Sequence, residues 1–249
     1  MMARLARIRR HPVKSVGGED LDEVSLSAHR RLPGDREWAV LHEAGERLAQ
    51  RQTDADWLPK SVFLNTAKSH PLQAVQGGWS GEVLNLTHPE HGQVSANPDT
   101  DGEMLIDWLQ PLWPDDRGAA TRLVHSPSGW TDEPKPFVSI LSLSSLAALE
   151  QAMGQKLDVE RWRGNLWVDG WAEFAERDLL GKTIRIGTVE LRIDEPIGRC
   201  TAPSGSATTG ETDCDMLASL KRFYDHTDFG VFATVMTDGA ISVGDEVVS

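Results

Sequence analysis

Cys200 is the residue with the clearest capacity for chemistry. It stands in a turn-rich segment, Pro196-Ile-Gly-Arg-Cys-Thr-Ala-Pro203, that follows a predicted strand and places Arg199 beside the thiol. A neighbouring cation favours the thiolate, and a thiolate can act as a nucleophile or as a ligand to a soft transition metal. The sequence also allows Cys200 to be a small buried apolar residue, because free cysteines are among the most buried residues.

Five basic residues stand at predicted strand ends or in turns, where arginine forks and lysine ammonium groups suit a phosphate. They are Lys14, Arg36, Arg161, Arg163 and Arg199. If they converge, they form an anion site in an acidic protein. Taken singly, each can equally be a solvated surface charge.

The second cysteine, Cys214, is expected to be structural. It lies between Asp213 and Asp215 at the start of a predicted helix, and these carboxylates disfavour its thiolate. Two cysteines are too few for a disulfide framework, an iron–sulfur cluster or a Cys₄ zinc site. A reducing, cytoplasmic location is therefore expected.

Composition narrows the class of protein. The 249 residues include 38 acidic and 25 basic side chains, and the formal charge of −13 argues against non-specific binding to nucleic acid or to anionic lipid. A hydrophobic share of 39% is typical of a globular chain. We find no apolar run of the roughly 20 residues that a spanning helix needs, and the N-terminus lacks the apolar stretch of a secretory signal. No membrane association is expected.

Common catalytic motifs are missing from the sequence. It contains no HExxH, no GxGxxG after a strand, no GxxxxGK[ST] and no GxSxG. A zinc hydrolase, a Rossmann dinucleotide site, a P-loop and a nucleophile elbow are therefore disfavoured.

Strand patterns dominate the N-terminal part. We predict strands over Ala6–Arg9, ended by Pro12, and over Trp38–Leu41. A turn at Ala44-Gly45 is predicted to lead into a further strand, Leu48–Gln52. This spacing favours a small antiparallel sheet or barrel. Two apolar segments in the Gly-, Pro- and Asp-rich middle, Val83–Leu86 and Met104–Leu109, stay unassigned.

The C-terminal part combines two helices with two hairpins. One helix is predicted over Leu143–Met153, closed by Gly154, and the other over Met216–Tyr224, with Met216, Leu220 and Phe223 on one face. One hairpin is predicted across Gly187-Thr188, from Lys182 to Asp194, and the other joins Val231–Met236 to Ile241–Val243 across Asp238-Gly239. We predict an α+β fold with mainly antiparallel strands and a boundary near residue 120.

Several short motifs follow one another in order along the chain. His11-Pro-Val-Lys-Ser15 and Gly34-Asp-Arg-Glu-Trp-Ala-Val40 resemble the N-terminal β-barrel module of the MOSC-domain family. Arg161-Trp-Arg-Gly-Asn-Leu-Trp-Val168 resembles its R-F-R-P-N motif, with Gly164 in place of the proline. The remaining similar segments are Ile197-Gly-Arg-Cys200, Thr209-Gly210, Leu217–Leu220, Phe229-Gly230 and Ser242-Val-Gly-Asp245.

The resemblance implies a molybdenum-cofactor protein, similar to the mitochondrial amidoxime-reducing component and its bacterial YcbX-like relatives. It implies an N-terminal β-barrel module (residues 1–120) packed on a MOSC β-barrel with a few helices (residues 121–249). The cysteine that matches Cys200 binds molybdenum in that family. The residues expected to contact the pterin and its phosphate are Lys14, Ser15, Arg36, Ser142, Arg163 and Asn165, joined by the cations Arg161 and Arg199.

Three functions follow as hypotheses. The first is an oxidoreductase that reduces small N-hydroxylated compounds with electrons from a separate protein, either a flavin reductase or a small electron-transfer protein. The second is a cofactor carrier or sulfur-transfer protein in which Cys200 carries a persulfide without redox turnover. The third is a plain binding barrel in which Cys200 is inert.

Overall fold

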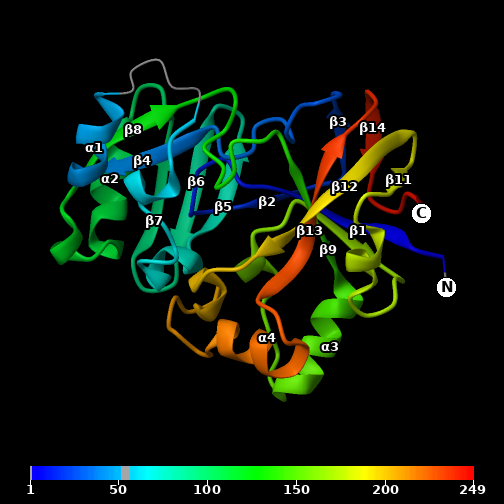
Figure 1. Cartoon of the computed structure of the whole chain (residues 1–249). Helices are drawn as coiled ribbons and strands as arrows, with labels where there is room; N and C mark the ends of the chain where they lie inside the picture. Colours follow the sequence, from blue (N-terminus) through cyan, green and yellow to red (C-terminus); the bar gives the residue numbers. More distant parts are fainter. Residues whose placement is uncertain (1, 52–56) are drawn as a thin grey trace.

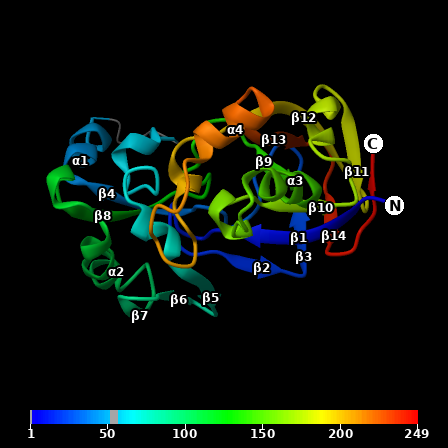
Figure 2. The ribbon, with the colours of Figure 1, turned by 90° about the horizontal axis from the view of Figure 1, so that it is seen from below.

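The computed structural model describes residues 2–51 and 57–249 and has two adjoining parts (Figure 1). One part holds the large sheet, a two-stranded sheet of β3 and β14 that packs on it, and helices α3 and α4; the other holds the remaining smaller sheets with helices α1 and α2 (Figures 1 and 2). Both termini lie at the end of the large sheet that faces away from the smaller part (Figure 2). The fold is α+β with mainly antiparallel strands, as the sequence predicts.

The large sheet has eight strands in the order β15-β11-β12-β13-β9-β10-β1-β2. Only the β9–β10 pair is parallel within this sheet. The strands are β1 (Arg4–Arg10), β2 (Glu19–Leu21), β9 (Val138–Ser142), β10 (Leu166–Asp169), β11 (Thr183–Ile186), β12 (Val189–Gly198), β13 (Asp228–Val235) and β15 (Val247–Val248).

Three smaller sheets complete the strand structure. A two-stranded sheet pairs β3 with β14, a second pairs β4 with β8, and a three-stranded meander runs β5-β6-β7. Their strands are β3 (Glu23–Leu26), β4 (Trp38–His42), β5 (Gln76–Ser80), β6 (Val83–His88), β7 (Gly92–Ala96), β8 (Ala120–His125) and β14 (Gly239–Ser242).

The centre of the large sheet, formed by β9, β10 and β13, is buried on both faces, because a separate apolar cluster covers each side. On one side, side chains such as Ile140 and Val231 pack with Leu26 and Ile241 of the β3–β14 pair. On the other side, Leu141, Trp167 and Phe229 pack against helices α3 and α4. The helices are α1 (Glu43–Ala49), α2 (Gly102–Leu109), α3 (Leu143–Met153) and α4 (Met216–Tyr224).

Helices α3 and α4 have the predicted bounds because their caps are local. The Ser142 side chain accepts a hydrogen bond from Ser145 N at the start of α3, and Gly154 ends it with φ +66°. The Asp215 side chain caps α4 in the same way. On the predicted face of α4, Met216 and Leu220 are buried and Phe223 is exposed, and Tyr224 packs on the ring of Phe174.

The first predicted hairpin is confirmed and the second is wrong. Strands β11 and β12 pair across Gly187, whose φ is +55°. Strand β14 pairs with β3 rather than with β13, so the C-terminal strands form no hairpin with each other. The Asp238 carboxylate accepts a hydrogen bond from Ala28 N at 2.7 Å, which ties the connection to the end of β3.

The predicted strand after Ala44-Gly45 is also wrong, because helix α1 occupies Glu43–Ala49. Gly45 does not form a turn. A Cβ atom there would lie 2.0 Å from the Val62 carbonyl oxygen, so the glycine permits close packing on the 3₁₀ helix Lys60–Val62. Gln52, at the end of the predicted strand, lies outside the described residues.

The two unassigned apolar segments lie in β6 and α2. Strand β8 begins at Ala120 and pairs with β4, and the predicted boundary near residue 120 stays a prediction. Over residues 2–51 and 57–249, no helix combines the length and apolar character needed to cross a membrane.

We expect Gly45→Ala to lower the free energy of unfolding by about 1–3 kcal/mol, because the added methyl group meets backbone that cannot move freely. Gly102→Ala is the control, since a Cβ at this first residue of α2 has its nearest neighbours at 3.6 Å. Urea denaturation of both variants measures the difference. A Gly45→Ala protein as stable as the Gly102→Ala protein would contradict this account of α1.

Candidate functional site

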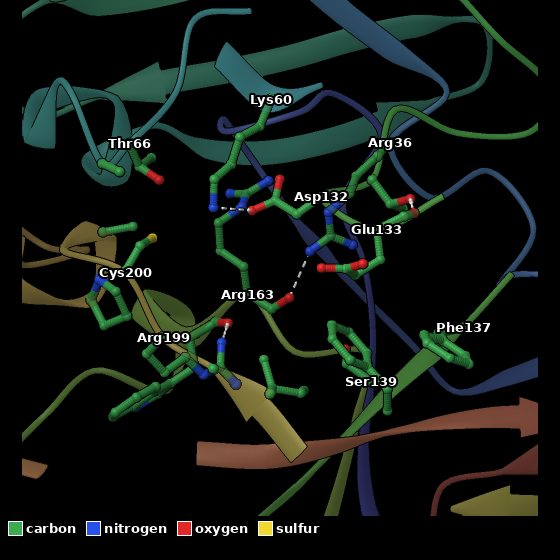
Figure 3. Close-up of a pocket in the computed structure, with 18 of the residues that line it drawn as sticks. Arg36, Lys60, Thr66, Asp132, Glu133, Phe137, Ser139, Arg163, Arg199 and Cys200 are labelled. Carbon is green, nitrogen blue, oxygen red and sulfur yellow. Dashed lines mark hydrogen bonds and ion pairs between the residues drawn. The ribbon is translucent and has the colours of Figure 1, made fainter. Parts of the chain in front are cut away.

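A cavity of about 410 Å³ lies between the two parts of the fold (Figure 3). Eight of the nine residues predicted for the site line it, namely Lys14, Ser15, Arg36, Arg161, Arg163, Asn165, Arg199 and Cys200. Counting all lining residues, seven are lysines or arginines and four are carboxylates. The described part of this acidic chain therefore contains a cavity whose lining is predominantly cationic.

Cys200 lies half-buried in the loop after β12 and contributes its thiol to one end of the cavity (Figure 3). Hydrogen bonds on either side hold this loop. Arg199 N donates to Thr227 O at 2.9 Å, and Thr201 Oγ1 donates to Ala67 O at 3.1 Å. Because Ala67 belongs to the smaller part of the fold, the second bond fixes the thiol relative to both parts.

The Arg199 guanidinium positions the cysteine loop. Its Nε donates to Phe229 O at 2.9 Å, its Nη1 donates to Trp162 O at 3.0 Å, and it lies 5.3 Å from the Trp162 ring centroid. Burial lowers the pKa of Arg199 to about 10, while Cys200 raises it. Within the described residues it forms no ion pair with a carboxylate, so its positive charge is not neutralised.

Arg163 carries a second buried charge of the same kind. Its backbone is left-handed, with φ +50°, which directs the side chain away from the 3₁₀ turn before it. The guanidinium donates to Gly17 O at 3.0 Å, Val13 O at 3.2 Å and Val16 O at 3.3 Å. Burial and the nearby Arg36 lower the pKa of Arg163 to about 9.

The Val13–Gly17 loop held by Arg163 also supplies Ser15, which is buried with φ +72°. Arg36 reaches the same region from a second left-handed position and donates to Arg163 O at 2.7 Å. It also pairs with Asp35, whose other oxygen accepts from His11 N at 2.8 Å. Burial and the cations around it, Arg163 first among them, hold the pKa of His11 well below its usual range.

Lys14 and Lys60 share the carboxylate of Asp132. Lys14 Nζ lies 2.5 Å from Asp132 Oδ1 and also donates to Trp130 O, and Lys60 Nζ lies 3.1 Å from Asp132 Oδ2 (Figure 3). Burial alone would raise the pKa of Asp132, but the two ammonium groups hold that pKa well below its usual range. Burial lowers the pKa of Lys14, and the Asp132 carboxylate partly offsets this lowering.

Arg161 touches the cavity but directs its charge elsewhere. The guanidinium is buried and pairs with Asp213 at 2.8 Å and Asp158 at 3.2 Å, and it donates to Pro203 O. These bonds tie the turn before β10 to the segment that follows Cys200. The charge of Arg161 is therefore already paired within the protein, and its predicted contact with the cofactor stays a prediction.

Asn165 has a similar structural use. Its side-chain oxygen accepts from Ser139 Oγ at 2.8 Å, and its amide donates to Arg9 O at 3.2 Å. The residue therefore joins β9, β10 and β1 where they border the cavity. Its side-chain oxygen and nitrogen both have partners in the protein.

Ser142 is the predicted residue that the cavity does not include. Its side chain is fully buried and caps α3 by accepting from Ser145 N at 3.2 Å. The serine that reaches the cavity from the same strand is Ser139. Strand β9 is buried on both faces, and the predicted contact of Ser142 with the cofactor stays a prediction.

Three lining residues, Lys60, Asp132 and Ser139, were not predicted from the sequence. Lys60 and Asp132 belong to none of the predicted motifs, and they meet because Trp130 packs with Val62 and Phe63. One feature of the sequence could have identified Ser139, because it is a polar residue within an otherwise mostly apolar strand. Among the described residues, no cluster of three or more His, Cys, Asp or Glu groups could hold a metal ion.

Comparison with family models identifies the class of protein. Residues 2–100 match the MOSC N-terminal beta barrel domain, and residues 131–248 match the MOSC domain. Together these ranges include most of the chain. The chain belongs to the MOSC-domain family, as the resemblance in the sequence implied.

Curated relatives are similar along most of this chain. Mitochondrial amidoxime-reducing component 1 of Xenopus laevis is 25% identical, over 95% of this chain and 79% of its own length. The Homo sapiens protein of the same name is also 25% identical, over 98% and 82%. Molybdenum cofactor sulfurase of Drosophila willistoni is 25% identical over 94% of this chain, which spans 31% of that longer protein.

Among solved structures, the YuaD protein of Bacillus subtilis aligns over 99% of this chain and 94% of its own, with a TM-score of 0.45 and 14% identity. YiiM of Geobacillus stearothermophilus aligns over 45% of this chain and 52% of its own, with a TM-score of 0.36 and 15% identity.

Cys214 provides a test of the electrostatics beside the site. Burial raises the pKa of its thiol to about 11; Arg161 opposes this shift and Asp213 adds to it. Because only the thiolate reacts, alkylation of Cys214 by iodoacetamide should speed up about tenfold for each pH unit between about 8 and 10. Mass spectrometry of the Cys214 peptide after timed labelling measures the rate, and a plateau below pH 9 would contradict the raised pKa.

Proposed function

We propose that this protein binds the molybdenum cofactor and reduces small N-hydroxylated compounds with electrons from a separate protein. The observation that carries the proposal is a half-buried thiol, Cys200, in a cavity lined by buried cations. Arg163 and Arg199 satisfy their hydrogen bonds with backbone carbonyls, which leaves their positive charges uncompensated. A buried unpaired charge is costly, so an anionic ligand is strongly favoured there.

The donor set fits a phosphorylated, sulfur-ligated metal cofactor. A thiolate is a soft ligand that suits molybdenum, and arginine and lysine suit a phosphate. Both kinds of group line the same cavity, whose volume is in the range of small-molecule sites. The names of the curated relatives, an amidoxime-reducing component and a molybdenum cofactor sulfurase, support a role connected with this cofactor.

Each residue then has a distinct part in the mechanism. Cys200 Sγ would be the protein ligand to molybdenum, while Lys14, Arg36 and Arg163 would hold the anionic end of the cofactor. Arg199 and Arg161 would act as positioning residues, because their bonds fix the segments on either side of Cys200. When bound, the cofactor supplies a metal centre that takes up and releases two electrons.

Electrons would come from a protein partner, either a flavin reductase or a small electron-transfer protein. The curated relatives named as amidoxime-reducing components support an N-hydroxylated substrate, and their sequence similarity extends along nearly the whole of this chain. The sulfurase similarity supports the alternative of a cofactor carrier or sulfur-transfer protein.

Replacing the thiol tests the ligand role directly. We expect Cys200→Ala, expressed in a host that makes the cofactor, to lose reduction of benzamidoxime by at least about 100-fold while its thermal unfolding is unchanged. Cys214→Ala is the matched control, because it removes the other cysteine, and it should keep both activity and molybdenum. Elemental analysis and an assay with chemically reduced viologen as electron source provide the measurements.

Two results would contradict the proposal. Wild-type activity in Cys200→Ala with bound metal would exclude the thiol as an essential ligand. An additional sulfur on Cys200 in protein that carries no molybdenum, seen by mass spectrometry, would favour the sulfur-transfer alternative.

A further inference from the structure

The end of the cavity around Cys200 is closed by a segment of the smaller part of the fold, residues 60–67. This segment begins at the 3₁₀ helix Lys60–Val62, which packs on α1 through the close contact between Gly45 and Val62. It ends at Ala67, whose carbonyl accepts the hydrogen bond from Thr201 Oγ1. The backbone under the Lys60 side chain is therefore held at a fixed position relative to the thiol.

The Lys60 ammonium lies at this end of the cavity with much of its hydrogen-bonding capacity unused. The side chain is 45% exposed, and within the described residues its Nζ makes one hydrogen bond, to Asp132 Oδ2 at 3.1 Å. The other oxygen of Asp132 is already bound by Lys14 at 2.5 Å. One carboxylate shared by two ammonium groups leaves a net positive charge, and Figure 3 shows Lys60 extending toward the space beside Cys200.

The charge state of Lys60 agrees with this placement. Burial alone would lower its pKa, but Asp132 and Cys200 together raise it above its ordinary value. Lys60 therefore keeps its proton at neutral pH. Because the side chain reaches solvent, a proton that it gives up can be replaced from water.

Reduction of an N-hydroxylated compound needs a proton at a defined atom. The N–O bond breaks, two electrons enter from the electron-transfer protein, one proton goes to nitrogen, and one goes to the oxygen that leaves as water. Without a proton the oxygen would leave as hydroxide, so a positioned acid lowers the barrier.

Three arginines of the cavity wall and Lys14 are poorly placed to give that proton. Arg36, Arg163 and Arg199 direct N–H groups to backbone carbonyls, so these donors already have partners within the protein. Lys14 is buried between Trp130 O and Asp132, which is held ionised. No histidine is among the residues that line the cavity.

We propose that Lys60 is a further catalytic residue, an inference that rests on the proposed function. The Lys60 ammonium binds the hydroxyl oxygen of the N-hydroxylated substrate. It also supplies the proton with which that oxygen leaves as water. Asp132 acts as its positioning residue, since the carboxylate holds the Lys60 side chain at the Cys200 end and is itself fixed by Lys14. The substrate class is thereby narrowed to compounds whose N–OH group can reach this ammonium.

The test compares Lys60→Met and Lys60→Arg in molybdenum-loaded enzyme with benzamidoxime as substrate. Lys60→Met should lower kcat about 100-fold, the size expected when a general acid is lost. Lys60→Arg should keep KM within about threefold of the wild-type value and still show the low kcat, because a guanidinium donates hydrogen bonds but not protons. Lys156→Met is the control; this lysine pairs with Glu150 on an exposed surface and should change neither constant.

Binding measurements separate this proposal from the proposed function. By calorimetry, Lys60→Met should weaken binding of benzamidoxime about fivefold and leave binding of benzamidine, which lacks the hydroxyl group, unchanged. If the wild-type protein reduces no N-hydroxylated compound, the proposed function fails. The difference between benzamidoxime and benzamidine binding then supports or overturns the contact of Lys60 with the hydroxyl group on its own. Equal effects on both ligands, or a kcat for Lys60→Met within about threefold of wild type, would overturn the proposal.

Discussion

The structure depends on buried guanidinium groups that, among residues 2–51 and 57–249, have no carboxylate paired with their positive charges. Arg163 binds the carbonyls of Val13, Val16 and Gly17, and Arg199 binds those of Trp162 and Phe229. Carbonyl groups satisfy the N–H donors but do not neutralise the charge, so the cavity keeps a positive potential inside an acidic protein. The same bonds shape the cavity wall, so its form and its preference for anions have one cause.

This arrangement divides the basic residues into two kinds. Arg161 has a structural role, because its ion pairs with Asp158 and Asp213 neutralise its charge and hold the segment after Cys200 in place. Arg163 and Arg199 hold backbone as well, but they leave a positive charge facing the cavity. Truncating either one would affect loop geometry and anion affinity together, so the two effects are separable only by measuring structure and binding in the same variant.

Local sequence signals predicted local structure well and long-range pairing poorly. Helix α3 was predictable because Ser142 and Gly154 cap it within its own segment. The pairing of β14 with β3 was not, because its hydrogen bonds join residues more than 200 positions apart. The site followed the same division: motifs located Cys200 and most of its cationic neighbours, whereas Lys60 and Asp132 belong to no motif and meet through the packing of residues 57–63 on residues 130–132.

The strand order of the large sheet has a consequence for how the protein is made. Strands β1 and β3 come from the first residues of the chain, and their partners β10 and β14 are translated much later. Such distant contacts slow folding and leave early strand edges open, which exposes the nascent chain to aggregation and to chaperones. A cavity completed by late segments has no finished wall until those segments have been translated and folded, so any molecule it accepts must enter after that point.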